Sequence, residues 1–280
     1  MLGLFKVPRH HLKKRAGIVT LIIVISLVSF GSYNAYSPIV NRYEMNINKP
    51  AGDISELNIV MASDMHFGLL SNREHAERLV KEINVLQPDI VLFPGDVFDD
   101  DVEQYIQQGI DEVMAGIQST YGVYVSLGNH DKHEGTMEHL IKVLEDSNLE
   151  VLYDETVMIE DSFTLVGRKD LTDRNRLQVS ALVDKVDMSK PIIMLDHQPY
   201  ELDIAQQNGI DLLVAGHTHR GQVFPGNLFT SRIFEIDWGH LQKEQLHTVV
   251  SSGYGFWGPP IRIGSRAEIV QITVRFNKQS

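Results

Sequence analysis

The chain has 280 residues, of which 43% are hydrophobic and 22% charged, so its composition is that of an ordinary globular protein with a sizeable core. Its net charge of -12 is uneven, because residues 1–15 carry five basic side chains and no acid, which leaves 20 of the 25 basic residues to face all 37 acidic ones. Such an acidic surface argues against broad nucleic-acid binding, and the absence of cysteine excludes disulfides, thiolate metal ligands and a cysteine nucleophile.

A long uncharged segment follows this basic N-terminus. Residues 16–41 contain no charged side chain, and residues 18–30 read IVTLIIVISLVSF. Residues 16–36 are long enough to cross a hydrocarbon core, which requires about 20 apolar residues. Flanking lysines and arginines stay in the cytoplasm. We therefore expect a cytoplasmic segment at 1–15 and a single-pass signal-anchor at 16–36 in the cell membrane, with the rest of the chain extracytoplasmic. A cleaved signal peptide is the alternative, although no small-x-small cleavage site follows.

The remaining chain is expected to hold a linker with an edge strand at 37–52 and one domain at 53–280. From residue 57, short apolar runs alternate with polar tips and amphipathic helices, which is typical of an α/β domain with its site at the strand ends. Strands are expected at 58–62, 90–93, 123–127, 163–166, 192–195, 212–215, 222–224, 247–251 and 268–274, with the edge strand at 43–47. Helices are expected at 71–86, beginning at a capping box of Ser71 and Glu74, and at 102–117, 136–147 and 177–186.

Residues of types that can bind or orient metal ions follow five of these strands. They are Asp64 and His66, Asp96 and Asp99, Asn129 to Asp131, Asp196 and His197, and His217 and His219. Side chains at the carboxyl ends of neighbouring strands converge on one crevice. Alternate residues of an extended segment point to one side, so each Asp-x-His or His-x-His pair is expected to grip one ion. Oxygen and imidazole ligands without thiolate suit Mn, Fe, Zn or Co.

These motifs resemble the ordered signature of the calcineurin-like metallophosphoesterase superfamily. The resemblance runs from about residue 58 to the C-terminus, and Gly221-Gln222 with Ser251-Ser252-Gly253 are similar to its extracytoplasmic YkuE-like and YaeI-like branch. It implies an α/β fold, a four-layer sandwich of two mixed β-sheets flanked by helices. The implied activity is that of a phosphodiesterase or related hydrolase, which cleaves a phosphate ester or pyrophosphate by attack of a metal-activated hydroxide.

The resemblance also implies a role for each motif residue. One divalent ion would take Asp64, His66, Asp96 and His219. The second would share Asp96 and take Asn129, His197 and His217. His130 would contact the substrate phosphate and assist the leaving group as the catalytic residue. Asp99 and Asp131 are expected to orient ligands rather than touch an ion, and Asp196 to do the same for His197.

The substrate stays open at this point. It is a phosphorylated small molecule or a lipid, and some relatives cleave UDP-2,3-diacylglucosamine. The alternatives are a non-catalytic, metal-containing binding protein and a metal-dependent nuclease, although no nucleic-acid partner is expected from an acidic surface. Arg220 is expected to point to solvent, and residues 167–170 with Arg174 to form a solvated turn. The aromatic loop at 254–260 is expected either to cover a ligand, to touch lipid or to pack against the domain. His133 is the one remaining histidine expected near the site.

Overall fold

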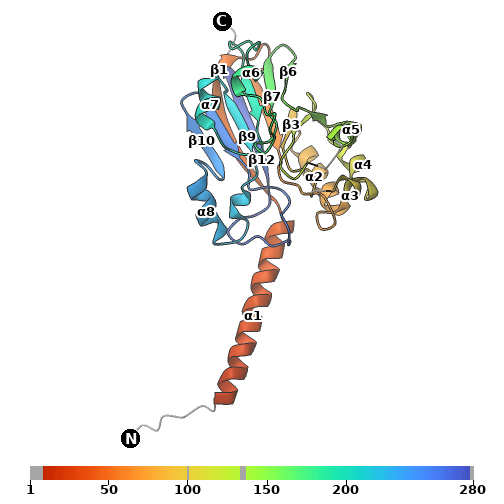
Figure 1. Cartoon of the computed structure of the whole chain (residues 1–280), viewed down its shortest axis with the longest axis vertical. Coiled ribbons are helices and arrows are strands. Elements are labelled where there is room, and N and C mark those ends of the chain that lie inside the picture. Colours follow the sequence, from red (N-terminus) through yellow and green to blue (C-terminus); the bar gives the residue numbers. More distant parts are fainter. Residues whose placement is uncertain (1–8, 100, 133–136, 278–280) are drawn as a thin grey trace.

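Two six-stranded β-sheets, packed face to face, position the strand ends (Figure 1). The computed structural model describes residues 9–99, 101–132 and 137–277. The first sheet has the order β1 (Ile39–Pro50), β12 (Glu268–Asn277), β2 (Glu56–Met61), β3 (Ile90–Pro94), β4 (Val123–Ser126), β5 (Glu150–Val151). The second has the order β10 (Gly239–Lys243), β11 (Leu246–Val250), β9 (Leu212–Ala215), β8 (Ile192–Leu195), β7 (Phe163–Gly167), β6 (Glu155–Ile159). Both sheets are mixed, because the pairs β12–β2, β10–β11 and β6–β7 are antiparallel among parallel neighbours.

Helices cover the outer face of each sheet, so the four-layer prediction is confirmed. Strands β3, β4, β8 and β9 are buried along their whole length, as expected for parallel strands covered on both faces. An apolar layer between the sheets includes Ile59, Leu195 and Ile272. The first sheet is covered by α2 (Arg73–Val85), α3 (Val102–Gln107), α4 (Ile110–Met114) and α5 (Met137–Asp146). The second is covered by α6 (Val179–Leu182) and α7 (Leu202–Gln207).

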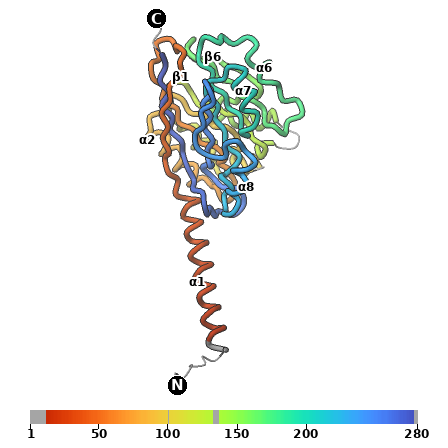
Figure 2. The backbone as a smooth tube through the Cα atoms, turned by 90° about the vertical axis from the view of Figure 1, so that its left-hand side faces the viewer, coloured from red at the N-terminus to blue at the C-terminus, as the bar shows by residue number. Residues whose placement is uncertain are grey.

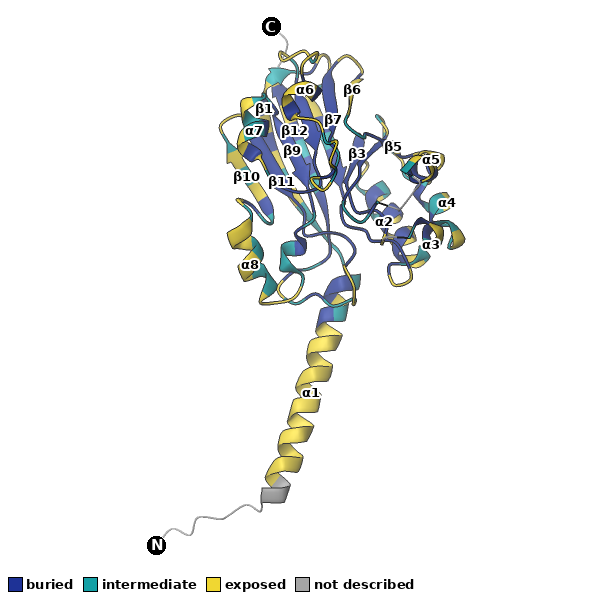
Figure 3. Cartoon of the chain, viewed as in Figure 1, coloured by how far each residue is buried: buried dark blue, intermediate teal, exposed yellow. Residues whose placement is uncertain are grey.

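A single long helix, α1 (Arg9–Tyr36), projects from one end of the domain. Within the described residues, one helix is long and apolar enough to cross a membrane, and its candidate span is Leu12–Tyr36. Residues 12–30 are exposed, and only the last turn is packed against the domain, as the colours of Figure 3 show. A long helix whose apolar side chains face outward all round is suited to a lipid environment.

Two predictions near the start of the domain need correction in their details. The edge strand is longer than expected, since β1 pairs in parallel with β12 from Ile39 to Pro50. The N-cap of α2 is Asn72 rather than Ser71, because the Asn72 side chain accepts a hydrogen bond from the backbone N of His75. The Ser71 hydroxyl instead donates to the carbonyl of Met65, and so holds the loop that follows β2.

Three further elements differ from their predictions for reasons of local backbone geometry. The helix expected at 102–117 divides into α3 and α4 at Gly109, which adopts a left-handed φ of 62°. The helix expected at 177–186 shortens to α6, since Asp154 and Arg168 bond the backbone of Leu177 and the next residue, Gln178, is extended. Residues 222–224, which the structure describes, form only isolated bridges, and the unpredicted helix α8 (Gly226–Ile233) follows them.

We expect the layer between the sheets to dominate the stability of the domain. Ile272 is fully buried there, so Ile272→Ala should lower the free energy of unfolding by about 2–5 kcal/mol through lost burial and a cavity. Urea titration of the chain in detergent micelles measures this change. Thr273→Ala on the same strand is the matched control and should cost far less, because Thr273 is only half-buried. Equal effects of the two substitutions would contradict the assignment of the core.

Candidate metal centre

Candidate metal ligands from both sheets meet at one edge of the sandwich. Asp64, His66 and His219 form one group, whose ligand atoms all lie within 4.8 Å of one another. Asp96, His197 and His217 form a second group by the same measure. The first group combines the loops after β2 and β9, and the second combines those after β3, β8 and β9. The convergence expected from the strand ends is therefore present in the fold.

The Asp96 carboxylate lies between the two groups. Its Oδ2 atom is 3.0 Å from His197 Nε2 and 3.8 Å from His66 Nε2. His66 Nε2 in turn lies 3.1 Å from His219 Nε2, which is 3.5 Å from Asp64 Oδ1. One carboxylate oxygen thus faces imidazoles of both groups, which is the arrangement that a shared ligand requires.

The backbone at these positions is not extended, so the reason first given for the paired motifs is wrong. Asp64, His66, Asp96, His217 and His219 all have positive φ angles, of 51°, 45°, 55°, 69° and 47°. Non-glycine residues rarely adopt this region, and such strain concentrates at functional sites. Asp64 and His66 still belong to one group, but His217 and His219 belong to different groups, so the expectation that each pair grips one ion is wrong for the His-x-His pair.

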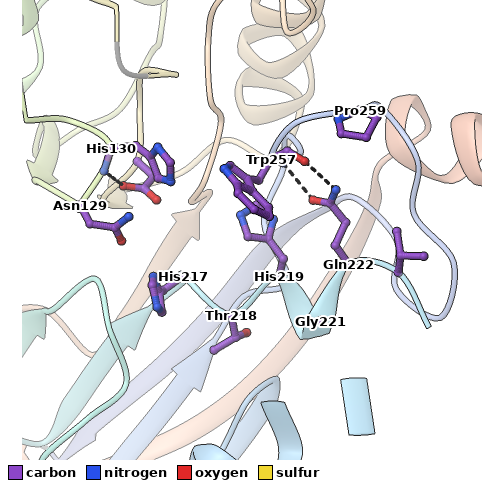
Figure 4. A pocket seen from close by; sticks show the side chains of 11 residues that line it. Asn129, His130, His217, Thr218, His219, Gly221, Gln222, Trp257 and Pro259 are labelled. Atoms are coloured by element: carbon purple, nitrogen blue, oxygen red, sulfur yellow. Dashed lines mark hydrogen bonds between the residues drawn. The ribbon is translucent and has the colours of Figure 1, made fainter. Parts of the chain in front are cut away.

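Asn129 and His130 complete the wall of the same pocket, which has a volume of about 520 Å³. Figure 4 shows both side chains lining it together with His217 and His219. The Asn129 Oδ1 atom is buried and has no hydrogen-bond partner among the described residues. The backbone N of His130 donates to Asp96 Oδ1 over 2.9 Å, and its ring lies 5.0 Å from the ring of His66. A buried oxygen left without a partner beside carboxylates is suited to a cation.

The three accompanying aspartates act differently from one another. Asp131 is fully buried and accepts hydrogen bonds from the backbone N atoms of Asp96, Phe98 and Gly128. It therefore organises the ligand loops through their backbones. Asp99 Oδ1 lies 3.8 Å from His66 Nδ1 at the pocket edge, and its side chain is 45% exposed.

Asp196 does not serve His197 as expected. Its carboxylate is fully buried and pairs with Arg168 at 3.3 Å and with Arg176 at 2.5 Å. The residue that orients His197 is Pro94, whose carbonyl can only accept, so His197 Nδ1 donates to it and Nε2 lies 3.0 Å from Asp96 Oδ2. Arg168 is consequently buried, and the expectation of a solvated turn at 167–170 is wrong for Arg168 and for Asp170, which is also buried, whereas Arg174 is exposed.

Charge is tightly balanced within the centre. Burial opposes protonation of His197, yet contact with Asp96 and Asp64 raises the pKa of its imidazole to about 10. Burial likewise opposes ionisation of Asp96, but His197 and His66 hold its pKa below the usual range. Burial, aided by cationic neighbours, lowers the pKa values of His66 and His217 to about 4. Ionised carboxylates and neutral imidazoles are the states that bind metal, so His197 would have to lose a proton at pH 7, and Asp64 as well at lower pH, because burial raises its pKa to about 6.

Two arginines near the centre were missed or misplaced by sequence reasoning. Arg262 is fully buried, with Nη2 3.2 Å from His219 Nδ1 and donating to the carbonyls of Gly253 and Gly255. No motif contains it, although it follows shortly after Ser251-Ser252-Gly253 and the aromatic loop at 254–260. Arg220 is half-buried with its guanidinium 3.9 Å from the ring centre of Trp238, so the expectation that it points to solvent is wrong.

The aromatic loop divides between the core and the pocket. Tyr254 and Phe256 are buried, and Tyr254 stacks on the ring of His75. Trp257 is 60% exposed and lines the pocket. The amide side chain of Gln222 donates to the Trp257 carbonyl and accepts from the Trp257 backbone N (Figure 4). His133, the other near-site candidate, lies outside the described residues.

Comparison with known proteins assigns the family. The family described as calcineurin-like phosphoesterase matches residues 57–221, and the chain belongs to this family of phosphoric ester hydrolases. A "Transmembrane protein with metallophosphoesterase domain" of Danio rerio is 30% identical, over 93% of this chain and 63% of that protein. An "Uncharacterized metallophosphoesterase" of Helicobacter pylori is 32% identical, over 78% of this chain and 59% of that protein. The chain thus spans about three fifths of the length of these curated relatives.

Two further likenesses complete this comparison. YkuE of Bacillus subtilis, itself an "Uncharacterized metallophosphoesterase", is 24% identical over 78% of both chains, in agreement with the branch suggested by the motifs. The solved structure of the Haemophilus influenzae NAD nucleotidase superposes with a TM-score of 0.45 and 17% identity, over 71% of this chain and 46% of that one. The zebrafish relative's name and the apolar helix α1 together support association of this chain with a membrane.

We expect metal binding at this centre to release protons. The pKa of His197 is raised to about 10, so at pH 7 this imidazole holds a proton that a cation must displace, with about one proton released at its site. Lower pH therefore favours the protonated ring of His197 and weakens metal affinity. Higher pH strengthens metal affinity up to the pKa of His197. Calorimetry with Mn²⁺ or Zn²⁺ in two buffers of different ionisation enthalpy measures the number of protons. Binding that releases none, with an affinity independent of pH, would contradict this arrangement.

Proposed function

We propose that the chain hydrolyses a phosphate ester or anhydride at a centre of two divalent ions. One ion would be held by Asp64, His66, Asp96 and His219, and the other by Asp96, Asn129, His197 and His217. The observation that carries the proposal is the position of Asp96 Oδ2, within 3.8 Å of imidazole nitrogens in both groups. The unpaired Asn129 Oδ1 supports it, because this atom lies buried where a ligand would be needed.

The ions, when bound, would lower the pKa of water and neutralise charge on the phosphoryl oxygens. The chain's own residues then have three tasks. His130 lines the pocket beside Asp96 and His66, where its imidazole would contact the phosphate and give a proton to the departing oxygen. Asp131 holds the loops of Asp96 and Gly128 in place, and Arg262 supports His219 from behind. Polar groups fixed in this way need no reorganisation during the reaction.

The proposed substrate is an amphiphilic phosphate or pyrophosphate, of the kind represented by UDP-2,3-diacylglucosamine. Its support is the mixed character of the pocket, in which the candidate ligands face an apolar wall of Val223, Trp257 and Pro259. A soluble phosphorylated metabolite would make little use of that wall. The two other candidate functions have less support: the acidic net charge disfavours a nuclease, and the presence of every expected ligand with His130 disfavours a non-catalytic binding protein.

We further propose that residues 1–15 are cytoplasmic, that residues 16–36 anchor the chain, and that the domain from residue 53 onward is extracytoplasmic. The support is the cluster of Lys13, Lys14 and Arg15 at the start of the apolar span. An uncleaved anchor is favoured over a cleaved signal by the packing of its last turn, because Arg262 and Ala267 donate backbone hydrogen bonds to Gly31 and Asn34.

His130→Ala tests the proposed catalytic role. We expect turnover of bis(4-nitrophenyl) phosphate to fall by roughly 10²–10⁴-fold, the usual contribution of a general acid, while the metal content stays the same. Steady-state kinetics and elemental analysis of the purified chain measure both quantities. His139→Ala is the matched control, since His139 lies on α5 beside Glu103 and outside the pocket. Unchanged turnover in His130→Ala would refute the role.

Asp96→Ala tests the shared ligand. Because this carboxylate faces both groups, its loss should lower the bound metal from about two ions per chain to one or fewer and abolish turnover together. Asp203→Ala, an exposed carboxylate on α7, controls for the loss of a negative charge. Two tightly bound ions in Asp96→Ala would show that this residue does not bridge.

A further inference from the structure

The membrane helix and the domain are joined by a rigid contact rather than a linker. Gly31 O accepts a hydrogen bond from Arg262 N at 2.9 Å, and Asn34 O accepts one from Ala267 N at 3.1 Å. A Cβ atom on Gly31 would lie 2.5 Å from Ile261 Cγ2, so the helix touches this loop at van der Waals distance. Tyr36 adds an edge contact with Phe256 at 5.2 Å. The direction of α1 therefore sets how the domain faces a bilayer.

The free part of α1 is too short to hold the domain clear of the membrane. Residues 16–30 are uncharged and exposed, and at Gly31 the helix becomes buried against the domain. Fifteen residues at about 1.5 Å each span about 22 Å, whereas a hydrocarbon core is about 30 Å thick. The end of the domain that surrounds residues 31–36 must then reach the bilayer, since otherwise this part of the span would lie in water or the bilayer would have to thin.

Apolar side chains are concentrated at that end. Of the thirteen large apolar side chains that the described part of the domain exposes, eight lie on α8 or on segments that are hydrogen-bonded to α1 or to the loop that holds it. They are Leu69, Leu70, Val223, Phe224, Leu228, Phe229, Ile233 and Trp257, which we call the apolar rim. Figures 1 and 2 both place α8, which carries three of them and has no buried described side chain, at the end from which α1 leaves. Leu70 is joined to α1 directly, because Tyr36 Oη donates to its carbonyl.

The apolar rim is continuous with the mouth of the metal pocket. Ile263, which packs near Gly31, donates its backbone N to Gln222 O at 3.0 Å and accepts from Phe224 N at 2.6 Å. Gln222 is bonded in turn to the backbone of Trp257, and Val223 and Trp257 line the pocket. The contacts of Ile263 with Gln222 and of Gln222 with Trp257 thus connect α1 to the entrance of the pocket.

We propose that the apolar rim is a second membrane contact, which inserts into the interface of the same bilayer that α1 spans. This inference rests on the proposed anchoring of α1 and deepens the proposed function. An apolar surface beside a fixed anchor gains by burial at the boundary of headgroups and acyl chains. The pocket then opens at the level of the headgroups, and a phosphate carried by a lipid reaches the metal centre while its acyl chains stay in the bilayer.

Single spin labels test this contact, since the chain has no cysteine and any introduced thiol is unique. Phe229→Cys on α8 and Leu69→Cys, next to the Leu70 carbonyl that Tyr36 of α1 binds, report the apolar rim in phosphatidylcholine vesicles. Met158→Cys on β6 is the matched control, because Met158 is also an exposed apolar residue but lies at the far end of the domain. Ile22→Cys reports the middle of α1.

The readout is the collision rate of each label with oxygen, which collects in lipid, relative to a water-soluble nickel complex. We expect this ratio at residues 229 and 69 to exceed that at residue 158 several-fold and to lie below that at residue 22. Ratios at 229 and 69 equal to that at 158 would overturn the proposal, as would a label in water at residue 22. The measurement uses no substrate, so a chain that hydrolyses nothing would refute the proposed function and leave this result standing.

Discussion

The buried carboxylate of Asp96 is the constraint on which the site depends. It must lie between imidazoles that come from two different sheets, with His197 on one side and His66 on the other. A carboxylate in such a position would be costly without compensating charge, and the proton drawn onto His197 supplies that charge in the absence of a cation. Cations would replace the proton and relieve the crowding of Asp64 and Asp96. The same closeness of two buried carboxylates therefore favours the binding of positive ions.

The surrounding backbone is shaped to permit this approach. A Cβ atom on Gly128 would lie 2.1 Å from Asp96 Oδ1, and one on Gly216 would lie 2.2 Å from Asp64 Oδ2. Side chains at these positions would push the carboxylates out of the cleft. Left-handed turns at five candidate ligands add strain, and at Asp96 the turn is held by Asp131, which accepts hydrogen bonds from the backbone N atoms of Asp96, Phe98 and Gly128. The two sheets thus set the positions of the loops, and the backbone turns in these loops set the directions of the ligand side chains.

One segment of the chain contacts both the helix α1 and the mouth of the pocket. The loop at residues 261–267 holds the last turn of α1, sends Arg262 toward His219, and lies beside the backbone of residues 222–224 at the pocket mouth. Anchoring and chemistry therefore share a scaffold instead of being separated by a flexible tether. A rigid joint of this kind is useful when the substrate itself is confined to a surface, because the orientation of the site is then set before encounter.

Sequence alone determined the features that are local in the chain. Apolar runs of four or five residues marked β3, β8 and β9, and polar ligand types directly after them marked the site, because burial and strand ends leave a short-range pattern. Only the tertiary structure decided which groups meet. The pairing of Asp196 with Arg168, the approach of Arg262 to His219 and the left-handed turns at the ligands depend on contacts between distant segments. The helix break at Gly109 is local, because glycine adopts the left-handed φ of 62°, whereas these contacts join segments far apart in the chain and leave no local pattern.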